Sequence, residues 1–330
     1  MLQKIKDALW HPALALISAM LNGFPAAGMV VIGVTGTKGK STVCEMLYAV
    51  LNATGHKTAL ISTIRFAYPG HDERNMFKMT MPGRGFIQKV LADAKKAGAT
   101  HAVVEITSEG ARQSRHAFLY LDGLIVTTIH KEHIESHGSF EKYVAAKRAI
   151  VAALEHSPKQ NKILVVNGDN EYTKKFLDAH VESKKTFAGS TAPGDFNNAN
   201  ARATTVMAEA LGISKEISEK AIHKMPQVRG RAEPVEAGQS FKVIVDYAHT
   251  AESMMELYGM FPGHKVCVFG STGGGRDRWK RPLMGKVADQ NCSTVILTND
   301  DPYDEDPEAI MKEIAEGMRH KPEMIVDRRL

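Results

Sequence analysis

Residues 30–47, VVIGVTGTKGKSTVCEML, contain the most informative pattern in the chain. The first half is a β-branched apolar run typical of a buried strand, and the second half begins a helical pattern. Between them lies a glycine-rich turn that ends in Lys-Ser-Thr, GTKGKST. Backbone N–H groups of such a turn, together with a helix N-terminus, form a cradle for phosphate oxygens. We therefore predict a phosphate-binding loop.

This loop is a compact variant of the usual pattern. The strict motif GxxxxGK[ST] requires glycine at position 34, where this chain has Val34, so the match is GxxGKS counted from Gly36. Lys40 supplies charge to the β- and γ-phosphates, and Ser41 a hydroxyl to Mg²⁺. The alternative is a turn that merely joins strand to helix. The order of strand, turn, Lys-Ser-Thr and helix favours nucleotide binding by Gly36, Thr37, Lys38, Gly39, Lys40, Ser41 and Thr42.

Short β-branched runs alternate with longer helical patterns along the whole chain. Near-continuous apolar strands separated by helices indicate a parallel sheet with both faces covered. A Pro- and Gly-punctuated stretch at 225–238, MPQVRGRAEPVEAG, indicates a domain boundary. The predicted fold class is α/β: a P-loop central domain with a mostly parallel sheet at 30–228, and a smaller Rossmann-like α/β domain at 229–330. An N-terminal helical docking segment at 1–29 precedes them.

Composition limits the partners. The 330 residues carry a net charge of +5 with no run of Lys and Arg interleaved with aromatics, which argues against a nucleic-acid partner. Cys44, Cys267 and Cys292 are far apart and form no CxxC pair. We therefore expect no disulfide and no structural zinc site, as suits the reducing cytoplasm.

The N-terminus resembles a weak signal peptide. Lys4 and Lys6 precede the apolar run ALWHPALALISAML, which contains His11 and Pro12. Cleavage near Ala27 would leave the nucleotide site at the mature N-terminus. We therefore favour an amphipathic docking helix, with at most loose membrane contact, over a signal or a membrane span.

Three polar residues follow or flank predicted strands. Glu105 ends HAVVE, His133 follows LIVTTI, and Lys147 lies early in a helix. Ligands gather at the carboxyl ends of parallel strands, where a carboxylate and an imidazole could bind metal ions that neutralise phosphate charge. Taken singly, Glu105 could be a surface acid, His133 a satisfied loop histidine and Lys147 a solvated helix residue. Their shared position favours a site.

Taken in order, the motifs resemble the Mur ligase family, most closely its MurE type, over residues 30 to 330. In the first domain, GVTGTKGKST resembles GVTGTNGKTT, MTMPG (79–83) a TTP segment, and EITSEGARQSR (105–115) the pattern EVSSHxLxxxR. TTIHKEHIESHGSFEKYVAAK (127–147) resembles TNLxxDHLDYHGxxxxYxxAK, and GDFNNANA (194–201) resembles GxFNxxNxxA. In the second domain, VDYAHT (245–250) is identical, and VRGRAEPV, FGSTGGGRDRWKRPLMG and TNDDPYDEDP resemble VPGRME, FGCGGDRDxxKRPLMG and TSDNPRSEDP.

The resemblance implies an ATP-dependent amide ligase of peptidoglycan biosynthesis. In such enzymes ATP phosphorylates a substrate carboxylate to an acyl phosphate, and the amine of an amino acid attacks it. Lys40, Glu105, His133 and Lys147 match catalytic positions, and Lys147 matches the lysine that the family carbamylates. Ser41 and Glu105 are implied to hold one Mg²⁺, and His133 with carbamylated Lys147 a second.

Further roles are implied in the same way. Asn197 and Asn200 match positions near the adenine, Arg231 an arginine that reaches the phosphates, and Asp246 an acid on the ribose. The acceptor and the amino-acid pocket are implied to involve Thr80, Thr107, Arg115, Arg276, Asp300, Asp301 and Tyr303. For Asp246 the alternative is a turn at a strand end.

The chain departs from the MurE pattern at four places. Only 29 residues precede the strand that enters the P-loop at Val30, where that type has a UDP-binding domain. The acceptor could therefore lack UDP, be held by a helper protein, or be bound by the central domain alone. Tyr303 replaces the arginine of DNPR, which argues against meso-diaminopimelate because tyrosine cannot pair with its distal carboxylate as a bidentate ion pair. Glu109 and Glu132 replace a histidine and an aspartate. The sequence ends at IVDRRL, before that type's GKGHE segment.

Three alternatives stay open. Folylpolyglutamate, poly-γ-glutamate and cyanophycin synthetases are amide ligases that share the loop. A non-catalytic ATP-binding pseudo-ligase would fit the missing segments, but would not require Lys40, Ser41, Glu105, His133 and Lys147 together. A small-molecule kinase or simple NTPase has no evident use for Lys147 or the second domain.

Overall fold

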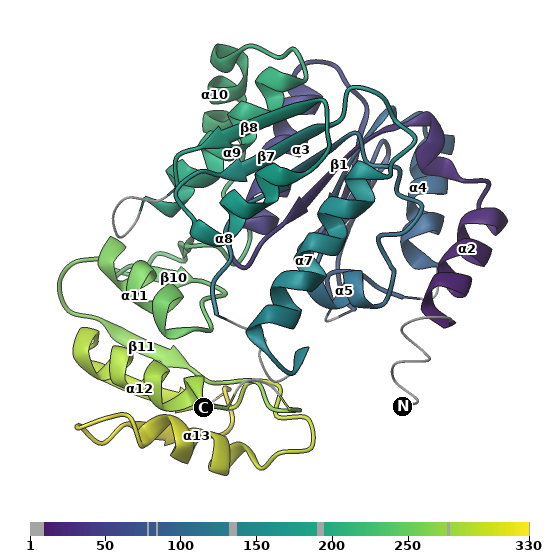
Figure 1. Cartoon of the computed structure of the whole chain (residues 1–330). Helices are drawn as coiled ribbons and strands as arrows, with labels where there is room; N and C mark the ends of the chain where they lie inside the picture. Colours follow the sequence, from purple (N-terminus) through teal and green to yellow (C-terminus); the bar gives the residue numbers. More distant parts are fainter. Residues whose placement is uncertain are drawn as a thin grey trace. The chain divides into compact units, whose positions relative to one another are not determined.

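The computed structural model describes residues 10–77, 79–83, 85–131, 137–189, 195–275 and 278–329 (Figure 1). The chain divides into two compact units. The first contains the described residues of 10–130, 141–189 and 196–228, and the second those of 131–140, 195 and 229–329.

The first unit is built on an eight-stranded sheet, counted over the described residues. Six neighbouring strands run parallel, and two antiparallel strands extend one edge. In spatial order the strands are β4 (His71–Arg74), β3 (Arg65–Tyr68), β2 (Thr58–Ile61), β5 (His101–Glu105), β1 (Val30–Thr35), β6 (Gly123–Val126), β7 (Ile163–Asn167) and β8 (Ser183–Phe187). The predicted α/β class is confirmed.

Helices cover both faces of this sheet. The chain leaves β1 toward β2 but later crosses from β5 to β6 and β7 in the opposite direction, and right-handed crossovers then place the connecting helices on opposite faces. Packed together on one face are α3 (Lys40–Ala53), α9 (Phe196–Ala210) and α10 (Lys215–Lys224). The other connections contain α4 (Phe86–Lys96), α5 (Ser108–Arg112) and α7 (Phe140–Glu155), with α8 (Glu171–Lys174) and η3 (Lys175–Asp178) before β8 (Figure 1).

The central strands are apolar because both of their faces are buried. Val34, Val103 and Ile125 are fully buried and share one core cluster with Leu47 and Met207, which come from the covering helices. The apolar strands and helices that were predicted from the sequence therefore contribute most of the core of this unit.

The antiparallel hairpin β3–β4 was not predicted. Its turn is Pro69–Gly70, and Gly70 has φ +81°. Both strands are short: β3 buries only Phe66 and Ala67, and β4 is polar and almost wholly exposed, so they lack the longer apolar run that identifies the central strands. Edge strands of this kind are marked by their turn rather than by their hydrophobicity.

The N-terminal segment includes the predicted helix. Helix α2 spans His11–Leu21, packs against α4, and is followed by the short η2 (Pro25–Gly28). Ser18 and Ala19 are buried, whereas Ile17, Met20 and Leu21 are exposed. No helix in the described part of the chain is long and apolar enough to cross a membrane.

The second unit is a smaller α/β assembly. Its parallel sheet has the order β11 (Val266–Phe269), β12 (Thr294–Thr298), β13 (Glu323–Ile325), and an antiparallel pair is formed by β9 (Glu233–Val235) and β10 (Val243–Val245). Its core lies among α11 (Ala251–Met260), α12 (Lys280–Asn291), α13 (Pro307–Ala315) and the parallel sheet.

Arg281 is the most unusual buried residue of the second unit. Its side chain is 1% exposed, and its Nη1 donates to Glu305 at 2.8 Å and to Glu313 at 2.7 Å. Nη2 donates to the carbonyl of Thr272 at 3.2 Å. One guanidinium therefore joins α12, α13 and the loops that follow β11 and β12.

Cys267 and Cys292 form a disulfide, so the prediction of no disulfide is wrong. Their separation of 25 residues is large along the chain, but the Cα atoms are 6.0 Å apart. Cys267 lies on β11, and Cys292 is the C-terminal cap of α12, two residues before β12, the neighbouring strand. Distance along the sequence did not predict whether the two cysteines are close in space. Helix α12 returns the chain to the edge of the sheet at which β11 begins, so Cys292 comes back beside Cys267. Cys44 is free and buried.

Replacement of Arg281 by methionine should destabilise the second unit by about 3 kcal/mol, because it removes the buried cation from Glu305 and leaves Glu313 with the exposed Arg278. The free energy of unfolding in urea measures this loss. Lys312→Met, which removes an exposed pair with Glu308, is the matched control and should change stability by less than about 1 kcal/mol. Equal effects of the two variants would show that Arg281 adds nothing through its ion pairs.

The same cluster predicts a pH dependence. The hydrogen bond from Arg281 lowers the pKa of Glu305 below its ordinary 4.5, with burial opposing, and the bond from Arg278 leads the lowering of the pKa of Glu313. The unfolded chain therefore binds more protons, so the stabilisation is present above pH 4.5 and is lost as pH falls through the folded values. Unfolding midpoints measured across this range should fall on acidification, and less steeply in Arg281→Met.

Candidate functional site

The glycine turn joins β1 to α3 in a conformation that requires its glycines. Gly36 has φ +144° and Gly39 has φ +81°. A Cβ at Gly36 would overlap the hydroxyl of Thr127, and a Cβ at Gly39 would overlap the side-chain oxygen of Asn200. Both positions therefore combine a left-handed backbone with close packing, which only glycine accommodates.

The loop is fastened to the segment that follows β6. The N–H of Thr37 donates to the carbonyl of Thr128 at 2.6 Å, and the Thr127 hydroxyl donates to the carbonyl of Lys38 at 2.6 Å. The N–H of His130 donates to the Thr37 hydroxyl at 3.0 Å. The loop is thus held in shape by its neighbours in the sheet.

Helix α3 begins directly at the end of this loop. Gly39 precedes Lys40 without a side chain to cap the helix. Ser41 and Thr42 are buried in the first turn, and Lys40 Nζ donates back to the carbonyl of Thr37 at 2.9 Å. The positive end of the helix, the lysine and the turn therefore coincide, which is the arrangement that binds phosphate.

Glu105 ends β5 beside the loop. It is 1% exposed, and its Oε1 accepts a hydrogen bond from Ser41 Oγ at 3.2 Å. A hydroxyl and a carboxylate fit Mg²⁺, which prefers oxygen ligands and takes one or two carboxylates together with substrate phosphates. In the described residues no three His, Cys, Asp or Glu side chains gather as a complete metal cage.

Lys147 reaches the underside of the loop from α7. It is 2% exposed, so the alternative of a solvated helix residue is wrong. Its Nζ donates to the carbonyl of Gly36 at 2.8 Å and to the Thr35 hydroxyl at 3.1 Å, and lies 5.4 Å from the centre of the Tyr143 ring. The Tyr143 hydroxyl is 2.7 Å from that of Thr37.

The three predicted acceptor residues of the first unit gather at segment 79–83: Thr80 belongs to it, and Thr107 and Arg115 contact Met81. The Thr80 hydroxyl lies 2.7 Å, oxygen to oxygen, from the Thr63 hydroxyl. The N–H of Thr107 donates to Met81 Sδ at 3.4 Å, while its hydroxyl caps α5. Arg115 donates to the carbonyl of Met81, and burial lowers the pKa of its guanidinium.

Two more predicted residues of the first domain lie on α9, and two predicted residues of the whole chain fall outside the described part of the structure. Asn200 is buried against Gly39, and Asn197 lies one turn earlier in α9. His133 lies outside the described residues, as does Arg276 of the predicted amino-acid pocket.

Arg231 and Asp246 belong to the second unit. Arg231 lies 4.7 Å from the centre of the Tyr247 ring. Both carboxylate oxygens of Asp246 accept backbone N–H groups, from Ala232 and Ala248, each at 2.6 Å. Asp246 therefore also organises the turn after β10, as the structural alternative predicted.

The loop after β12 packs against the glycine loop after β11. Gly273 donates its N–H to the carbonyl of Asp301 at 3.1 Å, and a Cβ at Gly274 would overlap the Tyr303 ring. Asp301 and Tyr303 have positive φ, +42° and +54°, and Tyr303 is exposed. Asp300 accepts from Arg328 at 2.8 Å.

Several polar residues at this edge were not predicted from the sequence. Ser271 Oγ, Thr298 Oγ1 and Asn299 Oδ1 are buried without a hydrogen-bond partner in the described structure. Buried polar atoms are normally paired, so these three leave hydrogen-bonding capacity unused. Thr298 and Asn299 lie in the TNDDPYDEDP motif, which was the available signal.

A parallel sheet with a glycine loop, a lysine and a serine–carboxylate pair at the carboxyl ends of its strands defines a P-loop α/β nucleotide-binding protein. Two family models cover nearly the whole chain: the Mur ligase middle domain matches residues 34–228, and the Mur ligase glutamate ligase domain matches 230–329. The chain belongs to the Mur ligase family. Members of this family are ATP-dependent amide ligases that form ADP and phosphate.

Individual relatives agree with this assignment. The chain is 35% identical to the UDP-N-acetylmuramyl-tripeptide synthetase of Roseiflexus sp. strain RS-1, over 92% of this chain and 69% of the relative. It is 30% identical to the UDP-N-acetylmuramoyl-L-alanyl-D-glutamate–2,6-diaminopimelate ligase of Solibacter usitatus, over 93% and 68%. The folylpolyglutamate synthase of Mycobacterium tuberculosis shares the fold, with a TM-score of 0.78 at 14% identity, over 96% of this chain and 86% of that structure.

Gly39→Ala should weaken nucleotide binding at least tenfold, because the new Cβ strains the backbone and pushes Asn200 away from the loop. Gly55→Ala is the matched control, since Gly55 has φ +85° at the other end of the same helix and open space around it. It should cost about 1–2 kcal/mol of stability while leaving affinity unchanged. Calorimetric titration with ADP measures the affinity of both variants. Equal affinities of Gly39→Ala and Gly55→Ala would contradict the packing argument.

Proposed function

We propose that this chain is an ATP-dependent carboxylate–amine ligase that adds an amino acid to a peptidoglycan-precursor-like acceptor. The observation that carries the proposal is the grouping of Lys40, Ser41, Glu105 and buried Lys147 around one glycine loop, in a chain that both Mur ligase domain models match. The acceptor carboxylate would attack the γ-phosphorus of ATP, giving an acyl phosphate and ADP. The incoming amine would then displace phosphate and form the amide.

Each residue has a physical task in this scheme. Lys40 and the loop amides would hold the phosphates, and Ser41 and Glu105 would hold Mg²⁺, which neutralises charge on the transferred group. Phosphoryl transfer depends mainly on positioning and charge neutralisation. Thr80 and the two residues that contact Met81, Thr107 and Arg115, are proposed to hold the acceptor.

Lys147 is proposed to act as a carbamate. Its neutral amine would add to carbon dioxide and release a proton, which converts a cation into an anion. The contacts of Nζ include two oxygens, the Gly36 carbonyl and the Thr35 hydroxyl. A carbamate would repel the carbonyl, so the group would turn toward a cation near the phosphates. His133 is proposed to share that cation.

The amino-acid pocket is proposed to include Arg276, Asp300, Asp301 and Tyr303. Packing of the two loops supports this, and the unpartnered oxygens of Ser271, Thr298 and Asn299 lie at the same edge. Tyr303 offers no guanidinium, and Asp304 follows it directly in the chain, whereas neighbouring Glu305 is paired with Arg281 and Asp306 caps α13. An amino acid with a distal ammonium, such as lysine or ornithine, suits this charge better than meso-diaminopimelate.

Helix α2 is proposed to make loose contact with a membrane surface. None of its eleven residues is Asp, Glu, Lys or Arg, and Leu16, Ile17, Met20 and Leu21 are exposed. Exposed apolar side chains on a short helix give weak, reversible association. Sedimentation of the chain with lipid vesicles, compared with Leu21→Glu, tests this.

Lys40→Ala should reduce ATP turnover at least a hundredfold, because the charge on the β- and γ-phosphates is lost. Lys38→Ala, in the same loop, is the comparison and should have a smaller effect because Lys38 lies before the helix. Phosphate release measures turnover. Normal turnover in Lys40→Ala would defeat the P-loop assignment.

Lys147→Ala should lose activity, and added short-chain carboxylates should restore part of it by occupying the place of the carbamate. The control is Lys142→Ala, earlier on the same helix, which should be insensitive to added carboxylate. Unchanged activity in Lys147→Ala would remove the carbamate from the scheme.

The decisive test is phosphate release from ATP and Mg²⁺ in the presence of paired acceptors and amino acids, with mass analysis of products. Release that needs both partners and yields a matching amide would establish the ligase and name its substrates. Tight ATP binding without release in any pairing would favour a non-catalytic pseudo-ligase, and release without an amino acid would favour a simple NTPase. Glutamate addition to a folate acceptor would indicate the folylpolyglutamate-type activity.

A further inference from the structure

The carboxylate of Glu105 has a different environment at each oxygen. Oε1 accepts from Ser41 at 3.2 Å and so faces the P-loop. Oε2 accepts twice from Thr63, from the backbone N–H at 2.8 Å and from the hydroxyl at 2.9 Å. Thr63 therefore fixes the rotation of the carboxyl group and leaves only Oε1 directed at the nucleotide end of the site.

The direction of these hydrogen bonds follows from the number of protons. An ionised carboxylate only accepts, so the single hydroxyl proton of Thr63 is donated to Glu105. The Thr63 oxygen must then accept from the Thr80 hydroxyl, 2.7 Å away. The chain of donors runs from Thr80 through Thr63 to Glu105, and so from the acceptor segment to the carboxylate beside Ser41.

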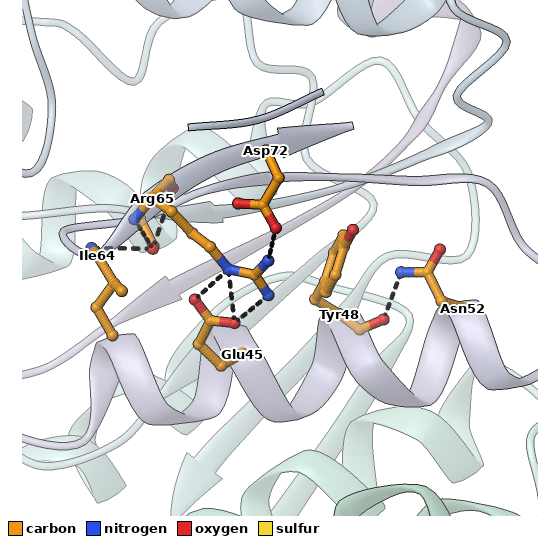
Figure 2. A network of polar contacts seen from close by, with 7 residues as sticks. Glu45, Tyr48, Asn52, Ile64, Arg65 and Asp72 are labelled. Atoms are coloured by element: carbon orange, nitrogen blue, oxygen red, sulfur yellow. Dashed lines mark hydrogen bonds and ion pairs between the residues drawn. The ribbon is translucent and has the colours of Figure 1, made fainter. Parts of the chain in front are cut away.

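The turn that presents Thr63 is itself anchored to the P-loop helix. Ser62 Oγ accepts the N–H groups of Ile64 and Arg65 at 3.1 and 3.2 Å. The Arg65 guanidinium grips both carboxylate oxygens of Glu45, which lies on α3 one turn after Ser41, and also pairs with Asp72 on β4 (Figure 2). The hydrogen bonds to Glu45 lead the causes that raise the pKa of Arg65, so the clamp stays charged at any physiological pH.

We propose that Thr63 is a positioning residue for the ligase reaction: it orients Glu105 toward Ser41 and couples the acceptor segment at Thr80 to the metal-binding end of the site. The inference rests on the proposed role of Glu105 toward Mg²⁺. If a group on the acceptor accepts the hydrogen bond of the Thr80 hydroxyl, Thr63 loses the donor that Thr80 provided. Binding of the acceptor and binding of the Mg²⁺-nucleotide should therefore affect each other's affinity. Such coupling is reciprocal by thermodynamic necessity.

The primary variant is Thr63→Val, which keeps the shape and the backbone N–H but removes the hydroxyl. The readout is nucleotide binding rather than turnover: calorimetric titration of the full chain with ADP at a series of Mg²⁺ concentrations. We expect the Mg²⁺ concentration for half-maximal tightening to rise about tenfold, as for other residues that orient a metal ligand. Thr63→Ser keeps the hydroxyl and should show the wild-type Mg²⁺ requirement.

Two further variants protect the test against a folding defect. Thr80→Val leaves Thr63 and its bonds to Glu105 in place, and should raise the Mg²⁺ requirement by a smaller factor. Asp72→Asn alters the exposed partner of Arg65 without touching Thr63, and should leave the requirement unchanged. Should Thr63→Val fail to fold, a wild-type Mg²⁺ requirement in Thr80→Val would overturn the proposed coupling.

Failure of this inference is distinguishable from failure of the metal assignment. Glu105→Gln should abolish the effect of Mg²⁺ on ADP affinity. If Glu105→Gln behaves like the wild type, the metal assignment itself is wrong. If Glu105→Gln is impaired but Thr63→Val matches the wild type, Glu105 binds metal and Thr63 has no positioning role.

Discussion

The P-loop, Glu105 and the segment at 127–128 meet because β1 lies between β5 and β6 and all three strands run in the same direction. Parallel strands end at the same edge, so three loops that are far apart in sequence become neighbours. Hydrogen bonds from Thr37 and Thr127 join the loop to the segment after β6, and the hydrogen bond from Ser41 to Glu105 joins it to the end of β5. With another strand order, Glu105 and residues 127–128 would not lie beside the glycine turn, and the turn alone would not form this site.

Much of the first unit could be predicted because its strands are buried on both faces and its helices repeat with a clear period. The elements that were missed follow other rules. At one edge β4 is polar and β3 buries only Phe66 and Ala67, and at the other edge β8 exposes Lys184 and Lys185, so none of the three has a long apolar run. The disulfide was missed because it depends on which strands are neighbours, a property that local sequence does not contain.

The candidate site divides in the same way. Lys40, Ser41, Glu105 and Lys147 could be named because each lies at a strand end or in a recognisable motif, and the structure places all four around one loop. Thr63 could not, because its importance comes from a contact with Glu105 across 42 residues of sequence. Asp246 shows the converse, since the motif that suggested a ligand role also performs a local turn function.

The clamp around Arg281 has a consequence for how specificity could change during evolution. Glu305 is fixed by a buried guanidinium, whereas Tyr303, two residues earlier, is exposed in a left-handed conformation. The frame of the loop is thus set from one side, and the exposed side chain at its tip contacts the glycine loop at Gly274. In the proposed amino-acid pocket, replacement at position 303 would exchange the chemical group offered to an incoming amino acid while the Arg281 ion pairs keep the loop in place, so one scaffold could serve amino acids whose distal ends differ in charge.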